Sequence, residues 1–158
     1  MRPYAFGVDI GGTTVKIGLF STAGKFLDHW EIPTRKEKHG ALILPDIAAS
    51  IDDKLKELDI SHEDLEGIGV GVPGPVLHDG IVDQCVNLGW GVFDVKGELS
   101  EIMRGVPVEV ANDANVAALG EQWSGGGKGY ENVVMVTLGT GVGGGIIIRG
   151  NILHGAHG

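Results

Sequence analysis

Two short segments combine the residue types that bind phosphate. One is Asp9 followed by the turn Gly11–Thr14, and the other is the glycine-rich turn Gly139–Gly144. Closely spaced glycines let the backbone approach a ligand, and the N–H groups and hydroxyls of such turns can line a nest for an anion. An acid beside that nest indicates a metal ion held near phosphate. Two such turns facing each other could hold a polyphosphate from two sides.

A third segment, Asn112-Asp113, stands where a predicted strand ends and a predicted helix begins. Ligands in open α/β sheets favour the carboxyl ends of strands. Asp113 could accept the proton of a substrate hydroxyl as that hydroxyl attacks a γ-phosphate, and Asn112 could bind neighbouring hydroxyls. Spacing alone favours the simpler alternative that this pair caps the helix, because both residue types are preferred N-caps.

Neither glycine turn has the spacing of a well-known nucleotide motif. The pattern G-x-x-x-x-G-K-[ST] does not occur in the chain. Gly139–Gly144 is loosely similar to a dinucleotide fingerprint, but it lies between two predicted strands instead of before a helix. For Gly11–Thr14, a plain Gly-Gly hairpin with solvated threonines remains the alternative to a phosphate turn.

Composition predicts a globular protein of one domain or little more. The chain has 158 residues, of which 42% are hydrophobic and 21% are charged. Its 28 glycines exceed the usual share of ~7% and cluster at turns between apolar runs. The formal net charge of −9 argues against nucleic acid or an anionic membrane as a partner. Backbone N–H groups and Mg²⁺ can still bind phosphate without a basic surface.

Cysteine content and hydropathy indicate where the protein resides. Cys85 is the single cysteine, so the sequence offers neither an internal disulfide nor a zinc pattern. It shows no signal peptide and no apolar run of about 18 residues. We therefore expect a cytoplasmic protein.

Hydrophobic periodicity predicts the elements that must position these residues. Apolar residues recur at three- and four-residue steps from Ile43 to Leu58 and mark a helix with Pro45 in its first turn. Further helices are expected at Asp94–Arg104 and Ala114–Trp123. Strands are expected at Tyr4–Ile10, Val15–Phe20, Lys25–Pro33, Gly67–Val72, Val106–Val110, Asn132–Leu138 and Gly143–Arg149.

The order of these elements predicts an α/β layer in which three antiparallel strands lead into parallel crossovers. The last two strands repeat the opening pattern of strand, Gly/Thr turn and strand, as the start of a second domain would. We expect an N-terminal domain at residues 1–123, a glycine-rich linker at 124–130 and the first hairpin of an incomplete C-terminal domain at 131–158.

Four motifs, in order along the whole chain, resemble those of the ROK family of repressors, open reading frames and sugar kinases. They are Asp9–Lys16, Gly71–Pro75, Asn112–Glu121 and Thr137–Ile146. The likeness is closest to the bacterial glucokinases of the family. The resemblance implies the ribonuclease H-like fold of actin-like ATPases and sugar kinases, an α/β fold with a mixed sheet and flanking helices. It also implies that ATP and a sugar bind between two domains.

The resemblance assigns roles to residues of the motifs. Asp113 would be the catalytic base, Asp9 would lie near Mg²⁺ and hold it through water, and Glu121 would support its helix. The sugar would contact Gly74, Asn87, Asn112 and Asp113. The phosphates of ATP would bind to Gly11, Gly12, Thr13, Thr14 and Lys16 in the first turn and to Gly139, Thr140 and Gly141 in the second.

The implied activity is ATP-dependent phosphorylation of a hexose, with glucose converted to glucose 6-phosphate in glycolysis. The chain resembles only the front half of such a kinase. A Glu-x-x-His sugar clamp and a cysteine-rich zinc motif follow in relatives, and we interpret His154 and His157 as surface or loop residues instead of metal ligands. This half alone is expected to be inactive, and the full-length protein is expected to be a homo-oligomer.

The final hairpin is expected to stay exposed, lean on the first domain or pair with another copy of the chain, because exposed strand edges invite pairing.

Two other functions stay open. A sugar-sensing repressor of the same family would carry a helix-turn-helix ahead of the Asp-Gly-Gly strand, and the strand that starts at Tyr4 leaves no room for one. A sugar- or nucleotide-binding fragment without turnover is the other alternative. The sequence identifies neither the sugar nor the phosphoryl donor, which could be ATP or polyphosphate.

Overall fold

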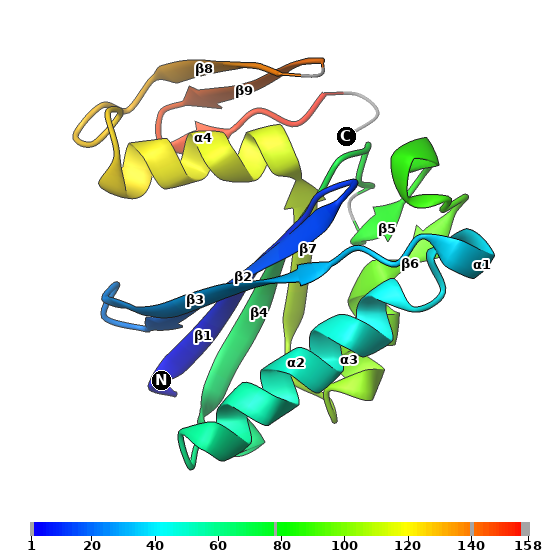
Figure 1. Ribbon diagram of the computed structural model, residues 1–158. Helices are drawn as coiled ribbons and strands as arrows, with labels where there is room; N and C mark the ends of the chain where they lie inside the picture. The colour runs from blue at the N-terminus through cyan, green and yellow to red at the C-terminus, as the bar shows by residue number, and fades with distance from the viewer. Residues whose placement is uncertain (1, 78, 140, 156–158) are drawn as a thin grey trace.

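The computed structural model of the protein describes residues 2–77, 79–139 and 141–155. Its main sheet consists of β1 (Tyr4–Ile10), β2 (Thr14–Ser21), β3 (Phe26–Pro33), β4 (Leu65–Val72) and β7 (Val108–Asn112). These strands lie in the order β3-β2-β1-β4-β7, as Figure 1 shows. The first three are antiparallel, whereas β1, β4 and β7 are parallel. The predicted mixed sheet is confirmed.

The parallel strands β1, β4 and β7 end at one edge of the sheet. Their register pairs Asp9 with Gly71 and Val72 with Asn112. Side chains alternate across a strand, and because Val8 and Ile10 are buried, Asp9 faces the opposite side of the sheet. The candidate residues of three separate segments therefore meet at the edge that ligands favour in such sheets.

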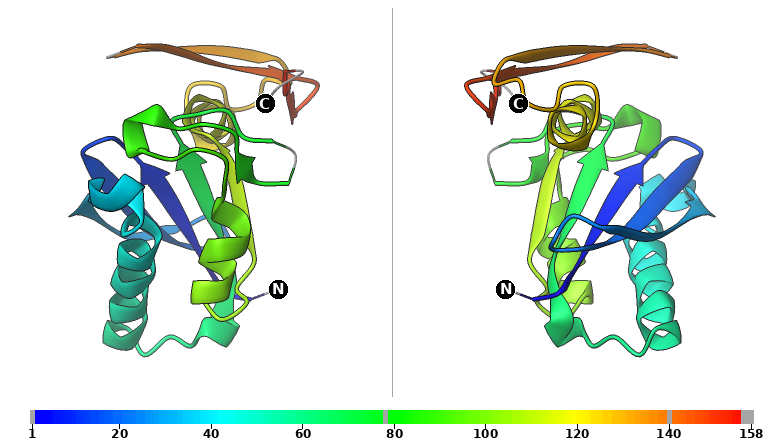
Figure 2. Two further views of the ribbon diagram at one scale, coloured as in Figure 1. Left: turned by 90° about the vertical axis from the view of Figure 1, so that its right-hand side faces the viewer. Right: turned by 90° about the vertical axis from the view of Figure 1, so that its left-hand side faces the viewer.

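Helices α2 (Ile43–Glu57) and α3 (Val95–Ile102) pack on one face of the sheet, and the core lies between them and the strands. Helix α4 (Asp113–Ser124) starts directly after β7 and lies across the edge where the parallel strands end, as Figure 2 shows. The apolar face predicted for α2 is confirmed. Its buried residues are Ile43, Leu44, Ile47, Ala48, Ile51 and Leu55.

We predict that Ile47→Ala will lower the free energy of unfolding by about 3 kcal/mol, because the side chain is fully buried and its loss leaves a cavity. Equilibrium unfolding in urea measures the change. Lys56→Ala on the outer face of the same helix is the control. Its side chain is 75% exposed, and we expect a change within about 0.5 kcal/mol. Equal effects of the two variants would contradict the placement of the core.

Strands β8 (Val133–Leu138), β9 (Val142–Ile148) and β10 (Asn151–Ile152) form a second sheet in the order β10-β9-β8. The predicted pairing of β8 with β9 as a hairpin is confirmed, and the hairpin leans on α4. Ile147 is buried on that side, whereas Val134 and Leu138 are 72% and 81% exposed. One face of the hairpin is thus packed and the other is open.

Shorter elements connect these parts. They are α1 (Glu37–Gly40), the 3-10 turns η1 (His62–Asp64) and η2 (Val86–Leu88), β5 (Ile81–Val82) and β6 (Phe93–Asp94). Among the residues that the structure describes, no helix is long and apolar enough to cross a membrane.

Most predicted boundaries differ from the structure by one or two residues, and two of these differences have a clear local cause. The strand expected at Val106–Val110 lies two residues later, at Val108–Asn112, because its register with β4 continues to Asn112. The helix expected to reach Arg104 ends at Ile102, because Arg104 and Gly105 adopt left-handed backbone angles that no right-handed helix continues through.

Candidate active site

One cleft of about 880 Å³ brings the three candidate segments together. Its lining residues come from the carboxyl ends of the parallel strands and from the facing ends of β8 and β9. The sequence-predicted residues that line it are Gly11, Gly12, Gly74, Asn87, Asn112, Asp113, Gly139 and Gly141. The predicted arrangement of two glycine turns about a common space with Asp113 is therefore present. Thr140 falls outside the described residues.

The turn between β1 and β2 is built for close approach. The Gly11 N–H donates to the Thr14 carbonyl at 3.0 Å, and a Cβ at Gly11 would lie 2.8 Å from that oxygen. Neither Gly11 nor Gly12 has a positive φ. Apart from its two chain neighbours, a Cβ at Gly12 would meet no atom of the described residues within 4 Å. Glycine is thus required at position 11 by the turn itself, while Gly12 leaves open space beside the cleft.

The N–H groups of Gly12 and Thr13 have no acceptor within the described part of the chain. They are available to an anion, as a phosphate nest requires.

Small residues set the second turn over α4. A Cβ at Gly145 would lie only 2.4 Å from Ala118 Cβ and 2.8 Å from the Ala114 carbonyl oxygen. A Cβ at Gly143 would similarly lie 3.2 Å from Ala114 Cβ. The backbone of β9 therefore sits directly on two alanines of the helix. This contact determines how far the turn between β8 and β9 lies from α4. Within the turn, the Gly139 N–H donates to the Gly141 carbonyl at 2.9 Å.

Asn112 is the N-cap of α4 and also holds the neighbouring loop. Its Oδ1 accepts hydrogen bonds from the N–H groups of Ala114 at 3.0 Å and Asn115 at 3.4 Å. Its Nδ2 donates to the Gly74 carbonyl at 3.1 Å. Gly74 is itself confined, because a Cβ there would lie 2.8 Å from the Gln84 carbonyl oxygen. One amide hydrogen of Asn112 remains for a ligand.

Asp113 is the first residue of α4, and the cap is already supplied by Asn112. Asp113 Oδ1 accepts the Ala114 N–H at 2.8 Å. The other carboxylate oxygen has no hydrogen bond within the described residues. That oxygen can accept a proton from a group in the cleft. Asn112 is therefore the cap, and the role of Asp113 as base stays a prediction.

Asp9 lies beside Asp113 in a smaller cavity of about 410 Å³ that adjoins the cleft. Gly71 separates them, because a Cβ at that position would lie 3.6 Å from Asp113 Cα and 3.8 Å from Asp9 Oδ1. The pKa of Asp9 is raised above its ordinary value of 3.8, chiefly because the surrounding protein removes water from the carboxylate. The charge of Lys16 opposes that rise in pKa, and the charge of Asp113 adds to it.

We predict that the contribution of Asp9 to stability falls as pH rises. A raised pKa means that the folded protein binds this proton more tightly than the unfolded chain does. The contribution is therefore fully present below the ordinary pKa and is lost as pH rises through the raised one. Relative to wild type, Asp9→Asn should gain stability over that window in urea unfolding at a series of pH values.

The cause of the Asp9 shift can be checked separately by NMR titration of its carboxyl. In Asp113→Asn, which removes one charge, the pKa of Asp9 should fall toward its ordinary value. A pKa of Asp9 at or below 3.8 in the wild type would contradict the geometry of this pair.

The structure does not bring every predicted residue into the cleft. Thr13 and Thr14 complete the first turn without lining the cleft, and Asp9 lines the adjoining cavity and a groove over the sheet instead of the cleft. Lys16 lies opposite Asp9 on β2, and both residues line that largely apolar groove over the sheet. Asn87, in contrast, stands in the cleft with an exposed side chain.

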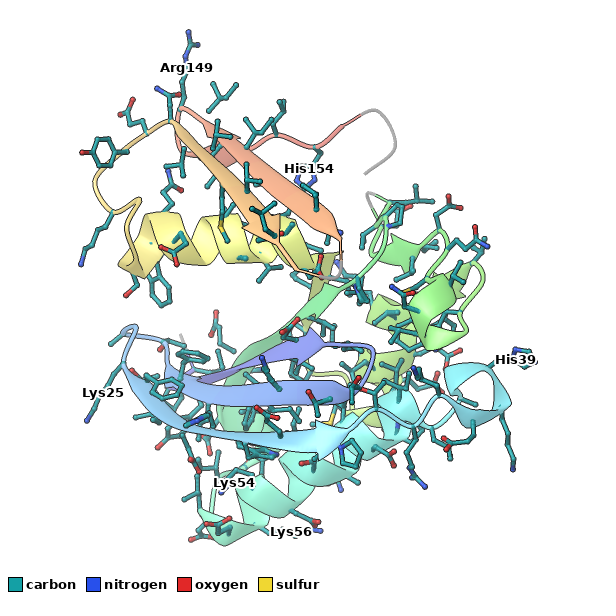
Figure 3. The ribbon with its side chains drawn as sticks, turned by 45° about the horizontal axis from the view of Figure 1, so that its top comes forward. Lys25, His39, Lys54, Lys56, Arg149 and His154 are labelled. Atoms are coloured by element: carbon teal, nitrogen blue, oxygen red, sulfur yellow. The ribbon has the colours of Figure 1, made fainter. Side chains whose placement is uncertain are left out.

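No lysine or arginine lines the described wall of the cleft. Figure 3 shows labelled basic side chains at the periphery, pointing outward: Lys25, His39, Lys56 and Arg149. A phosphate here would be met by backbone N–H groups and by two carboxylates, Asp9 and Asp113. A divalent cation between phosphate and carboxylate fits this set of charges, and hard oxygen ligands are those that Mg²⁺ prefers. The described residues contain no cluster of three metal-binding side chains.

Three residues at the cleft and the adjoining cavity have roles that were not predicted from the sequence. Thr137 and Asn115 line the cleft from β8 and α4, and Gly71 separates the two carboxylates. All three lie inside motifs that the sequence analysis identified. The sequence therefore indicated the segments to which they belong, but not the roles of these residues. Glu121 has the expected supporting role, since its Oε2 accepts the Gly126 N–H at 2.8 Å after the helix ends.

Comparison with known proteins agrees with this geometry. Residues 5–158 match the sequence profile of the ROK family. The chain is 52% identical over 153 residues to the glucokinase of Halalkalibacterium halodurans, a match that covers 96% of this chain and 46% of that protein. It thus spans about half the length of the curated relatives it matches.

Solved structures and a more distant relative widen the comparison. The crystal structure of a ROK family glucokinase from Streptomyces griseus in complex with glucose and AMPPNP superposes with a TM-score of 0.84 at 34% identity. That match covers 98% of this chain and 47% of the other. A putative xylose repressor from Caldicellulosiruptor is 30% identical over 153 residues, covering 96% of this chain and 38% of that protein.

Proposed function

The chain belongs to the ROK family, and on that premise we propose that it is the N-terminal half of a kinase that transfers the γ-phosphoryl group of ATP to glucose. The product would be glucose 6-phosphate. The observation that carries the proposal is the shared cleft, which is lined by two glycine turns and by Asp113, whose second carboxylate oxygen has no hydrogen bond within the described residues. Such a kinase needs positioning and charge neutralisation more than covalent chemistry from the protein.

In the proposed reaction, Asp113 acts as general base. Its unpaired carboxylate oxygen accepts the proton of a glucose hydroxyl while the hydroxyl oxygen forms a bond to the γ-phosphorus and ADP leaves. The N–H groups of Gly12 and Thr13 and the turn at Gly139–Gly141 hold the phosphates. Mg²⁺, when bound, neutralises phosphate charge, and Asp9 is the residue that would hold it through water.

The sugar side of the cleft is assigned to polar groups near Asp113. The exposed amide of Asn87 and the remaining amide hydrogen of Asn112 can bind sugar hydroxyls. Gly74 contributes by shape, since its loop lines the cleft and is held by Asn112. These contacts orient one hydroxyl toward Asp113.

The proposal that the chain is the N-terminal half of a kinase also implies a division into domains. Residues 1–123 form the N-terminal domain, 124–130 a glycine-rich linker and 131–158 the first hairpin of a C-terminal domain. The open face of β8 and β9, with Val134 and Leu138 exposed, fits a hairpin that other parts of the whole protein cover. Turnover and assembly as a homo-oligomer are accordingly proposed for the full-length protein.

The test is phosphoryl transfer by the full-length protein, that is, this chain together with the rest of its gene product. Glucose, mannose, fructose, allose and N-acetylmannosamine are each supplied with ATP or with polyphosphate, and sugar phosphate is measured by ³¹P NMR. We expect the highest kcat/KM for glucose with ATP. Absence of transfer from either donor to any hexose would overturn the proposal. Sugar binding without turnover would then indicate a binding protein, and sugar-dependent DNA binding would indicate a repressor.

A further inference from the structure

Thr34 joins the end of one strand to the phosphate turn of another. It follows β3 directly and is the only polar residue of the described chain that is buried, at 9% exposure. Its Oγ1 donates to the Gly11 carbonyl at 2.7 Å, and its N–H donates to the Thr13 carbonyl at 2.9 Å. Thr34 itself lines none of the described cavities.

These bonds determine which way the turn faces. The carbonyls of Gly11 and Thr13 are held by Thr34, and that of Thr14 is held by the Gly11 N–H. The Gly11 carbonyl and the Gly12 N–H belong to one peptide plane, so the hydroxyl bond from Thr34 also fixes the direction of the Gly12 N–H. The N–H groups of Gly12 and Thr13 are left for a ligand.

We propose that Thr34 is a positioning residue that sets the phosphate turn for the nucleotide. The inference rests on the proposed function, because it assigns the turn to the phosphates of ATP. It deepens that function by naming a residue outside the cleft that controls donor affinity without touching the substrate. The hydroxyl is the essential group, since the N–H bond to Thr13 would survive in any residue except proline.

A purely structural role makes a different prediction. Thr14 pairs with Pro33, so the Thr34 N–H bond extends the β2–β3 ladder around the turn. The hydroxyl bond does not belong to that ladder, because it links the end of β3 to the end of β1. If Thr34 only stabilised the fold, its loss would reduce the folded fraction and leave the nucleotide affinity of the folded protein unchanged.

The test measures binding of MgATP to the full-length protein by calorimetry, together with KM for MgATP and for glucose. Thr34→Val keeps the shape and removes the hydroxyl, so the Kd for MgATP should rise about five- to tenfold, the loss expected for one hydrogen bond. The KM for glucose should stay within about twofold. Thr34→Ser retains the hydroxyl and should restore the wild-type Kd. Thr34→Ala carries the same prediction as Thr34→Val if the valine variant does not fold.

Ser100→Ala is the matched control. Ser100 Oγ donates to the Val106 carbonyl at 2.9 Å, a bond of the same kind that lies away from the cleft. Its removal should lower stability and leave the Kd for MgATP unchanged. An unchanged Kd in Thr34→Val, or an equal weakening of MgATP and glucose, would overturn the inference.

The two proposals fail in different ways. If the wild-type protein binds MgATP but phosphorylates no hexose, the proposed function is overturned. The Kd of Thr34→Val for MgATP relative to that of the wild type would still decide the role of Thr34. A wild-type protein that does not bind MgATP would overturn both.

Discussion

Replacing Asp113 with asparagine will lower kcat of the full-length protein for glucose phosphorylation by about a thousandfold, with little change in KM for either substrate. A positioned general base contributes roughly 10²–10⁴-fold, and asparagine cannot accept the proton. The substitution keeps the size of the side chain and its ability to accept the Ala114 N–H. A coupled assay of ADP release measures the loss.

This substitution separates catalysis from capping. Asparagine caps helices as well as aspartate does, so a residue that only supports the start of α4 would show no loss of kcat. The control is Asp94→Asn, at the N-cap of α3, where the carboxylate accepts the Gly97 N–H at 2.8 Å. That variant should keep wild-type kcat. Wild-type turnover in Asp113→Asn would contradict the assignment of the base.

Gly145→Ala is expected to lower the free energy of unfolding by about 2 kcal/mol and kcat/KM for MgATP by about 100-fold. The new methyl group would lie 2.4 Å from Ala118 Cβ and 2.8 Å from the Ala114 carbonyl oxygen, so β9 and α4 must separate. The second phosphate turn moves with the hairpin, and a misplacement of about 1 Å can cost about 10²-fold in rate. Urea unfolding and steady-state kinetics measure the two effects.

Gly144→Ala provides the comparison for Gly145→Ala. Gly144 is the neighbouring residue on the same strand, and a Cβ there would make an ordinary contact of 3.4 Å with the Met135 carbonyl oxygen. The methyl group and the strand are the same, but the added atom faces away from α4. The free energy of unfolding of Gly144→Ala should differ from that of the wild type by less than about 1 kcal/mol. A Gly145→Ala variant as stable as Gly144→Ala would contradict the packing of the hairpin.

Local patterns account for most of the fold. The three- and four-residue spacing from Ile43 to Leu58 predicted α2, because that periodicity depends on burial of one face. Apolar runs on either side of a glycine turn predicted β1 with β2 and, by the same pattern, the β8–β9 hairpin. The sequence could not choose between a free hairpin and a packed one. That choice depends on Gly145 meeting Ala118, two small residues far apart in the chain.

The site was predictable at the level of motifs and less so at the level of contacts. Gly11, Gly12 and Asp113 line the cleft as expected, because strand ends determine where they meet. Lys16 pairs with Asp9 across the strands and lies on the same face of the sheet, but its position one strand further out places it in the groove over the sheet instead of the cleft. Thr34 belongs to no motif, and only the pairing of three strands brings its hydroxyl to Gly11.

The central claim is that the two glycine turns bind one nucleotide together. Amide NMR signals of Gly12 and Gly139 in the full-length protein report on the two turns, and Gly105, which lies outside the cleft, serves as the reference. On titration with MgATP, the signals of Gly12 and Gly139 should shift along one saturation curve with a common Kd, while that of Gly105 stays in place. A shift at only one turn, or two different Kd values, would contradict the account.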